Sequence, residues 1–270
     1  MTEKYNIDDL QYLMARLRDP DGGCPWDLKQ TFATIVPSTI EEAYEVAEAI
    51  EREDFGHLPE ELGDLLFQVI FYAQMGSEQE RFSFDGIVHT LVAKLVRRHP
   101  HVFPTGELRG ERREGGLDEQ KVRDSWESIK EAERTSKGEQ GALAGVATAL
   151  PALTRAAKLQ KRAARTGFDW PDIDQVLAKA QEEIGEVREA IATGDLDAAR
   201  EEVGDLLFAV VNVARHLKAD PETQLRATNR KFERRFAFVE SAITGSGRVL
   251  EDAGLEEMDA AWDQAKERGL

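Results

Sequence analysis

Apolar residues of this chain recur at every third or fourth position in several segments, which is the period of an amphipathic α-helix. The clearest examples lie at residues 40–50 in the first half and 184–191 in the second, and each carries one apolar stripe. The stripe residues are Ile40, Tyr44, Ala47 and Ile50, and then Ile184, Val187 and Ile191. Strand patterns are weak. The chain is therefore predicted to be all-α, built from helical bundles.

Short polar breaks follow both striped segments, at residues 54–57 and 193–195. Breaks of this length join antiparallel helices, and Pro59 suits the first turn of the helix after the first break. Ser38 with Glu41 is typical of a capping box at the start of the first striped helix. Asp172 or Asp174 can cap its counterpart. We expect two antiparallel helix pairs.

An acidic pattern occurs twice, 141 residues apart. Residues 41–74 and 182–215 align without gaps and are identical at 17 of 34 positions, including the run E-E-x-G-D-L-L-F. Duplication is the simplest explanation. The small, polar segment 136–141 is typical of a linker, so we expect tandem homologous domains at 1–140 and 141–270.

The repeated acidic residues are Glu41, Glu42, Glu45, Glu61 and Asp64, and then Glu182, Glu183, Glu186, Glu202 and Asp205. Positions i and i+3 share a helix face, so four carboxylates of each copy can converge, whereas Glu41 and Glu182 are offset in angle. Clustered anions repel unless they are protonated, paired or bound to metal. Oxygen ligands suit Mg²⁺ or Mn²⁺. The alternative, a solvated acidic helix face, is less favoured because the pattern recurs beside apolar residues.

Cations and aromatic residues also recur. Lys94 and Arg98 lie four apart on one helix face, as do Lys231 and Arg235, and each pair could hold phosphate oxygens or form an ordinary basic surface. Trp126 with Lys130 has a counterpart in Trp262 with Lys266. An indole beside an ammonium suits a nucleobase next to phosphates, although a tryptophan that anchors a terminal helix is an equally good explanation.

Composition limits the partners and the compartment. The formal net charge of −17 disfavours a nucleic-acid polymer or an anionic membrane, because both would be repelled. Cys24 is the only cysteine, which rules out an intramolecular disulfide and fits a reducing compartment. The first ten residues lack the apolar core of a signal peptide. We expect a cytoplasmic protein that binds neither nucleic-acid polymer nor membrane.

With its tandem acidic motif, the chain resembles the MazG family of nucleoside triphosphate pyrophosphohydrolases, in its two-copy form. Further segments carry the resemblance: Gly23-Cys24-Pro25-Trp26-Asp27, the run from Glu41 to Val46, Asn229-x-Lys231-Phe232-x-Arg234-Arg235-Phe236, and Trp262-x-x-x-Lys266. The resemblance implies an all-α, Mg²⁺-dependent homodimer that splits nucleoside triphosphates into monophosphate and pyrophosphate.

The resemblance also implies roles for single residues. Glu183, Glu186, Glu202 and Asp205 would be the metal ligands and catalytic residues, assisted by Glu182, and one carboxylate would orient or deprotonate the attacking water. Lys231 and Arg235 would engage phosphates, and Asn229, Trp262 and Lys266 would complete the nucleotide pocket. Phe32 stands where many relatives have histidine, and Val92 corresponds to Asn229. We therefore expect the second copy to be the principal catalytic one.

Three other interpretations stay open from the sequence. The chain could be a narrower pyrophosphatase for dUTP or a phosphoribosyl nucleotide. It could be an acidic helical interaction module without hydrolase activity, which would need no Mg²⁺. In a mixed case, the first copy would stabilise a dimer or regulate while the second copy catalyses.

Overall fold

The computed structural model describes residues 4–111, 118, 122, 125–126, 128–130, 132–133, 138, 141–245 and 247–270. Contacts between residues divide the chain into two units, Met1–Glu131 and Ala132–Leu270. The domain boundary predicted at residue 140 falls on a residue outside the described part, so it stays a prediction. Within the described residues the secondary structure is helical and contains no strand, which confirms the all-α prediction.

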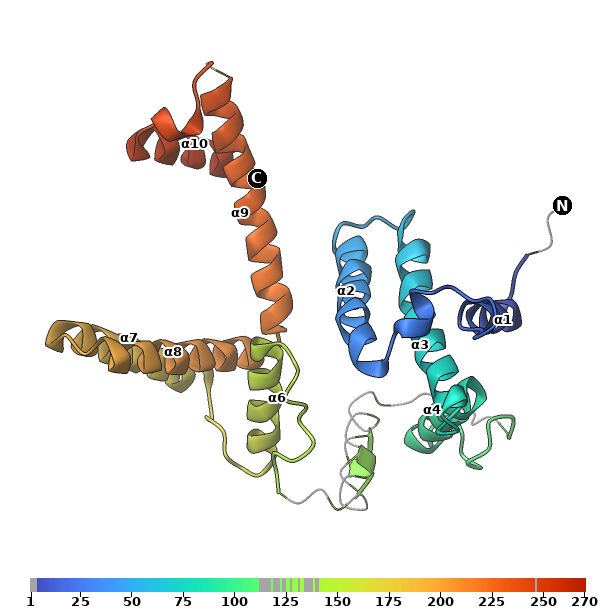
Figure 1. Cartoon of the computed structure of the whole chain (residues 1–270). Helices are drawn as coiled ribbons and strands as arrows, with labels where there is room; N and C mark the ends of the chain where they lie inside the picture. The colour runs from blue at the N-terminus through green and yellow to red at the C-terminus, as the bar shows by residue number, and fades with distance from the viewer. Residues whose placement is uncertain are drawn as a thin grey trace. The chain divides into compact units, whose positions relative to one another are not determined.

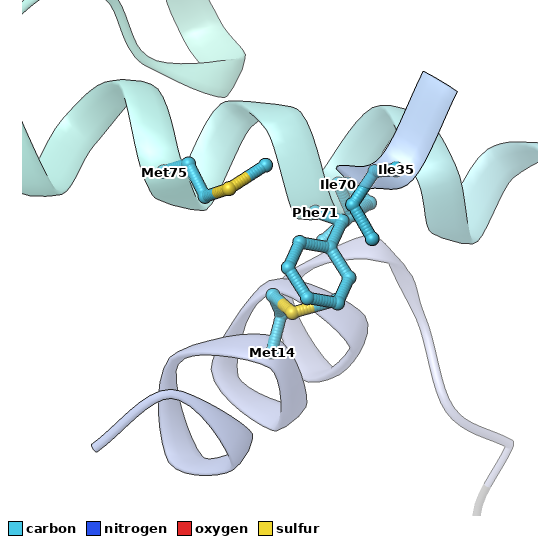
Figure 2. Packing of buried hydrophobic residues seen from close by; sticks show 5 residues of the cluster. All are labelled: Met14, Ile35, Ile70, Phe71 and Met75. Atoms are coloured by element: carbon cyan, nitrogen blue, oxygen red, sulfur yellow. The ribbon is translucent and has the colours of Figure 1, made fainter. Parts of the chain in front are cut away.

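The first unit contains α1 (Ile7–Leu17), a short 3-10 turn η1 (Asp27–Lys29), α2 (Phe32–Glu51), α3 (Leu58–Glu78) and α4 (Phe84–Arg98). α2 packs along α3, α1 crosses the other side of α3, and α4 contacts α3 (Figure 1). Five buried residues fill the space between these helices: Met14, Ile35, Ile70, Phe71 and Met75 (Figure 2). The core of this unit is thus a closed apolar cluster around Phe71.

The second unit contains α6 (Ala152–Arg165), α7 (Ile173–Thr193), α8 (Leu196–His216), α9 (Pro221–Thr244), η2 (Leu250–Asp252) and α10 (Leu255–Glu267). α7 and α8 form the predicted hairpin, and α6 packs on α8 (Figure 1). α10 packs on α9 around Val239, Ile243, Ala253 and Ala261. No helix among the residues that the structure describes is both long enough and apolar enough to span a bilayer.

The predicted start of the first striped helix at Ser38 is wrong. α2 begins at Phe32, because the hydroxyl of Thr31 accepts from the backbone N–H of Thr34 at 3.3 Å, and the Thr34 hydroxyl accepts from the N–H of Thr31 at 2.8 Å. Pro37 therefore lies inside the helix, where it removes one helical hydrogen bond without ending the helix. The other signals were read correctly, since Asp172 caps α7 and Pro59 lies in the first turn of α3.

The two apolar stripes do not line the interior of their units. Ile40 and Ile50 remain 49% and 50% exposed, and Ile184 and Ile191 remain 40% and 57% exposed. The hairpin partners α3 and α8 also expose apolar residues, including Leu62 and Leu207. Each unit therefore presents an apolar face along its acidic hairpin.

Candidate functional site

Local capping sets the register of the α7–α8 hairpin. Asp172 Oδ1 accepts from the N–H of Gln175 at 2.9 Å at the start of α7, and Asp195 Oδ1 accepts from the N–H of Ala198 at 3.0 Å at the start of α8. Between them Gly194 adopts a left-handed conformation with φ 80°, which a residue with a Cβ adopts only under strain. This tight turn brings the two acidic motifs into opposition.

The opposed motifs bring three carboxylates together in each unit. Glu183, Glu186 and Glu202 each place one oxygen within 4.8 Å of the others, and Glu42, Glu45 and Glu61 do the same in the first unit. Asp205 and Asp64 do not belong to these closest groups. The structure thus gathers three of the four predicted ligands of each copy, and it leaves the fourth on the same helix hairpin.

A lysine that the sequence analysis missed balances the second cluster. Lys179 Nζ lies 2.8 Å from Glu182 Oε1 and 2.8 Å from Glu183 Oε1. This contact lowers the pKa of Glu183, which is only 5% exposed, below its usual range, and the carboxylates raise the pKa of Lys179. The hydrogen bond with Glu183 raises the pKa of Glu186. The i, i+3 and i, i+4 spacing of Lys179 from Glu182 and Glu183 was a signal that could have identified it.

The first cluster lacks the equivalent lysine, because Ser38 occupies the position of Lys179 in the repeat alignment. Desolvation, and then the neighbouring Glu45, raise the pKa values of Glu42 and Glu61. The two clusters therefore have similar geometry and different electrostatics. The first has no lysine at this position, whereas the second carries a positive charge in contact with its most buried carboxylate.

A cavity of about 640 Å³ opens beside the second cluster. Lys179, Glu183 and Asp205 line its polar part. The rest of its wall is mostly apolar and comes from Leu143, α6, α8 and residues 167–170, the segment that precedes α7. Asp169 holds that loop on α8, because its Oδ2 accepts from Arg215 Nη1 at 2.9 Å.

The repeat alignment pairs a residue that lines this cavity with a buried aromatic residue of the first unit. Asn212, which lines the cavity, aligns with Phe71, and Phe71 is 1% exposed within the core shown in Figure 2. Phe71 there packs in one cluster with Met14. Both units thus have the acidic hairpin. At the aligned position beside it, the first unit has a packed core residue and the second unit has a residue that lines a cavity.

The residues predicted to bind phosphate and base lie on α9 and α10. Arg235, Trp262 and Lys266 contact other residues of these two helices and of the C-terminal end. Arg235 Nε donates to the backbone oxygen of Leu270 at 2.7 Å, and its guanidinium lies 5.7 Å from the ring centroid of Trp262. Trp262 packs against the core of these two helices, as the alternative interpretation expected. Lys266 pairs with Asp263 at 2.8 Å. Asn229 and Lys231 are exposed on α9.

Within a single chain, none of these α9 and α10 residues lines the cavity beside the second cluster. In the first unit, Lys130 Nζ lies 3.6 Å from the ring centroid of Trp126, so that predicted pair does share a face. Lys94 and Arg98 lie on α4, and both are partly buried. The roles predicted for these residues stay predictions.

Comparison with known proteins explains the duplicated hairpin. The model of the MazG nucleotide pyrophosphohydrolase domain matches residues 30–103 and 172–238, which together make up more than half of the chain. The chain belongs to this family. The two matched segments contain both acidic motifs and the cations of α4 and α9, whereas α10 lies outside them.

Two relatives match this MazG-family chain over nearly its whole length. The nucleoside triphosphate pyrophosphohydrolase of Escherichia coli K12 is 48% identical over 266 residues, which covers 98% of each chain. The nucleoside triphosphate pyrophosphohydrolase/pyrophosphatase MazG of Thermotoga maritima is 40% identical over 260 residues, which covers 96% of this chain and 95% of its own. The predicted family and enzyme class are confirmed.

Proposed function

We propose that the second copy hydrolyses nucleoside triphosphates to monophosphate and pyrophosphate, with Mg²⁺ as the physiological ion. The observation that carries this proposal is the group of Glu183, Glu186 and Glu202 oxygens within 4.8 Å of one another, beside a cavity that Asp205 also lines. In the reaction, the oxygen of a water molecule forms a bond to the α or β phosphorus. The bond from the attacked phosphorus to the bridging oxygen breaks, and the bridging oxygen leaves with the electron pair on the other phosphate group. The water gives its proton to one of the carboxylates.

The donor set fits a hard divalent cation. All the candidate ligands are carboxylate oxygens, which Mg²⁺ and Mn²⁺ prefer, and three of them already lie close enough to share an ion. When bound, such an ion supplies charge neutralisation for the triphosphate oxygens. The protein's own part is to hold the carboxylates in the hairpin and to position the water with one of them.

Two features favour the second copy over the first as the catalytic one. The second cluster opens on a cavity of about 640 Å³, whereas the aligned position in the first unit holds the buried Phe71. The second cluster also has Lys179 within 2.8 Å of Glu183, so a cation already stands where phosphate charge would approach. The first copy would then serve assembly or regulation, with its carboxylates in the same geometry.

A homodimer would explain the exposed apolar faces. Ile184 and Ile191 on α7, and Val203 and Leu207 on α8, are each at least 40% exposed. Pairing of two such faces would bury this surface. Because these side chains are already about half buried, each would contribute about 1 kcal/mol, roughly half of the value for a fully exposed side chain. In such a dimer, Lys231 and Arg235 on α9 of one subunit would reach the carboxylates of the partner subunit. Nucleotide turnover would take place in the cytoplasm.

The test is product analysis of the purified chain with a panel of nucleoside triphosphates, with Mg²⁺ or with chelator. Glu202→Ala with Asp205→Ala should abolish the formation of monophosphate and pyrophosphate. The chain offers a matched control, since Glu61→Ala with Asp64→Ala makes the same change in the first copy and should leave most turnover intact. If only the control variant lost turnover, the catalytic site would be assigned to the first copy.

The same panel, extended with a phosphoribosyl nucleotide, separates the rival functions. Turnover of dUTP alone, or of a phosphoribosyl nucleotide alone, would indicate the narrower pyrophosphatase. No turnover of any nucleotide would favour an interaction module. Hydrolysis in oxygen-18 water would show which phosphorus is attacked, because the label enters the product that contains that phosphorus.

A further inference from the structure

An arginine on α8 ties the α6–α7 loop, residues 166–172, to the end of the acidic hairpin. The carboxylate of Asp169 in this loop accepts two hydrogen bonds from Arg215, one from Nη1 to Oδ2 at 2.9 Å and one from Nη2 to Oδ1. The side chains are only 18% exposed for Arg215 and 29% exposed for Asp169, and the contact holds the pKa of Asp169 below its usual range. A two-point contact of this kind is directional as well as strong, so it fixes the loop against α8.

Apolar packing contributes little to the position of this loop. Its two aromatic residues, Phe168 and Trp170, are 81% and 43% exposed, so neither anchors the loop in a core. A second polar contact comes from α8, where His216 Nε2 lies 3.3 Å from Asp169 Oδ1. The middle of the loop is therefore held on α8 mainly through the carboxylate of Asp169.

The remaining nitrogen atoms of Arg215 also have partners. Its Nε donates to Asn212 Oδ1 at 2.9 Å, and its Nη2 donates to the same oxygen at 2.7 Å. Asp169, Asn212 and Arg215 all line the cavity beside the second cluster. A cation in this cavity could bind phosphate directly, but each nitrogen of this guanidinium already donates to a protein oxygen. The geometry therefore favours a positioning role for Arg215 over direct contact with the substrate.

The first unit ties its corresponding loop with different residues. Gln74 stands at the position of Arg215 in the repeat alignment. Instead Arg18, which follows α1, donates from Nε and Nη2 to the carboxylate of Glu78 at the end of α3, at 2.9 and 2.7 Å, and its Nη1 donates to the backbone oxygen of Asp27. Both units thus connect the loop before the first acidic helix to the end of the second one. In the second unit this connection also lines the cavity.

We propose that Asp169 and Arg215 form a clasp that positions the α6–α7 loop as a wall of the cavity while the second copy turns over its nucleotide. The inference rests on the proposed function, because it takes the substrate to bind beside the second carboxylate cluster. Both are positioning residues, since they contact each other and not the reacting atoms. Release of the clasp lowers the fraction of molecules in which the wall is in place, and the apparent affinity for nucleotide falls with that fraction. KM responds to the clasp, whereas kcat does not.

Asp169→Asn and Arg215→Met each remove the charge pair. Each variant should raise KM for ATP about tenfold and leave kcat within about twofold of the wild type. The double variant should raise KM no further than either single variant, because both changes break the same contact. Additive effects on KM, or a loss of kcat at unchanged KM, would overturn the clasp. A lower KM in Asp169→Asn would also overturn it, because the released Arg215 would then bind phosphate.

The first unit supplies a matched control in Glu78→Gln. This change breaks the tie made by Arg18, and the Glu78 side chain is 32% exposed, close to the 29% of Asp169. Glu78→Gln should leave KM and kcat unchanged, and an equal rise of KM in this variant would overturn the specific role of the second clasp. Asp169→Asn keeps the shape of the side chain, so it decides the question if Arg215→Met fails to fold.

Hydrogen exchange follows the loop without any turnover. Asp169→Asn should speed the exchange of backbone N–H groups in residues 166–172 at least about fivefold, whereas Glu78→Gln should do so in residues 22–30. Unchanged exchange in residues 166–172 would overturn the clasp. Faster exchange there with an unchanged KM would overturn the positioning role and leave the proposed function standing. Absence of hydrolysis by the wild type would reject the proposed function, and exchange would still show whether the clasp holds the loop.

Discussion

Replacement of Lys179 by methionine tests whether this lysine balances the second acidic cluster. At 2.8 Å and an effective dielectric constant of about 20, the attraction between unit charges is ~6 kcal/mol before desolvation. The Lys179 side chain is 35% exposed, so solvent screening reduces this strongly, and its contact with the well-exposed Glu182 adds little. The loss of charge beside the buried Glu183 should therefore cost about 2 kcal/mol.

Urea unfolding in chelator measures this cost directly. With a slope of about 1–3 kcal/mol per molar urea, the transition of the second unit should move down by about 1 M. Lys158→Met is the control, since Lys158 is exposed on α6 and should shift the transition little. Mg²⁺ should narrow the gap between Lys179→Met and the wild type, because the bound ion replaces the missing positive charge.

The effect also has a predicted pH dependence. Because Lys179 lowers the pKa of Glu183 in the folded state, the pair stabilises the fold above the ordinary glutamate pKa, and this contribution is lost as the pH falls through the lowered value. The two proteins should differ at pH 7.5 and converge in strong acid. Equal midpoints in chelator at pH 7.5, or an equal loss in Lys158→Met, would refute the reasoning.

Three further variants test the contrast between the two copies. Met14→Ala should destabilise the first unit by about 2–5 kcal/mol in urea unfolding, because Met14 is fully buried in that unit, and turnover by the second copy should persist. A cost below about 1 kcal/mol would contradict this packing. Asn212→Phe introduces the residue found at the aligned position of the first unit and should raise KM for nucleotides at least tenfold, with helicity retained by circular dichroism. An unchanged KM would show that the nucleotide does not occupy the cavity. Glu42→Gln should stabilise the first unit in chelator at pH 8 and not at pH 4. The reason is that the raised pKa of Glu42 makes its charged form unfavourable in the folded state. Stabilisation at both pH values would point to another cause.

Local patterns predicted the helices and the carboxylate groups well. Helical periodicity, Pro59 and the break at residues 193–195 are properties of short segments, and they defined the α2–α3 and α7–α8 pairs. The i, i+3 spacing placed Glu183 and Glu186 on one face, and the duplicated motif predicted that Glu202 lies opposite them. Such arguments succeed because each depends on one helix or on one hairpin.

Features that depend on packing between separate segments were not predicted. The cavity needs α6, the loop around Asp169, and α8 to be placed together, and no periodicity within one of them reports the space between them. The same holds for the contact of Arg215 with Asp169. The start of α2 was predicted too late because Ser38 with Glu41 fits a capping box, whereas the Thr31–Thr34 capping box begins the helix earlier.

The two units show how a duplicated site can diverge while its acidic hairpin is kept. Both units gather three carboxylates within 4.8 Å, so the hairpin alone does not distinguish them. Two positions of the repeat alignment distinguish them. Ser38 in the first unit corresponds to Lys179 in the second, which changes the charge next to the cluster. Phe71 in the packed core of the first unit corresponds to Asn212, which lines the cavity of the second. A buried aromatic side chain stabilises its unit, whereas an open cavity lacks those packing contacts and leaves room for a ligand. In the proposed function, stability and substrate recognition are separated between the copies. Exchange of the two residues should then lower the stability of the first unit, through Phe71→Asn, and weaken nucleotide binding by the second unit, through Asn212→Phe.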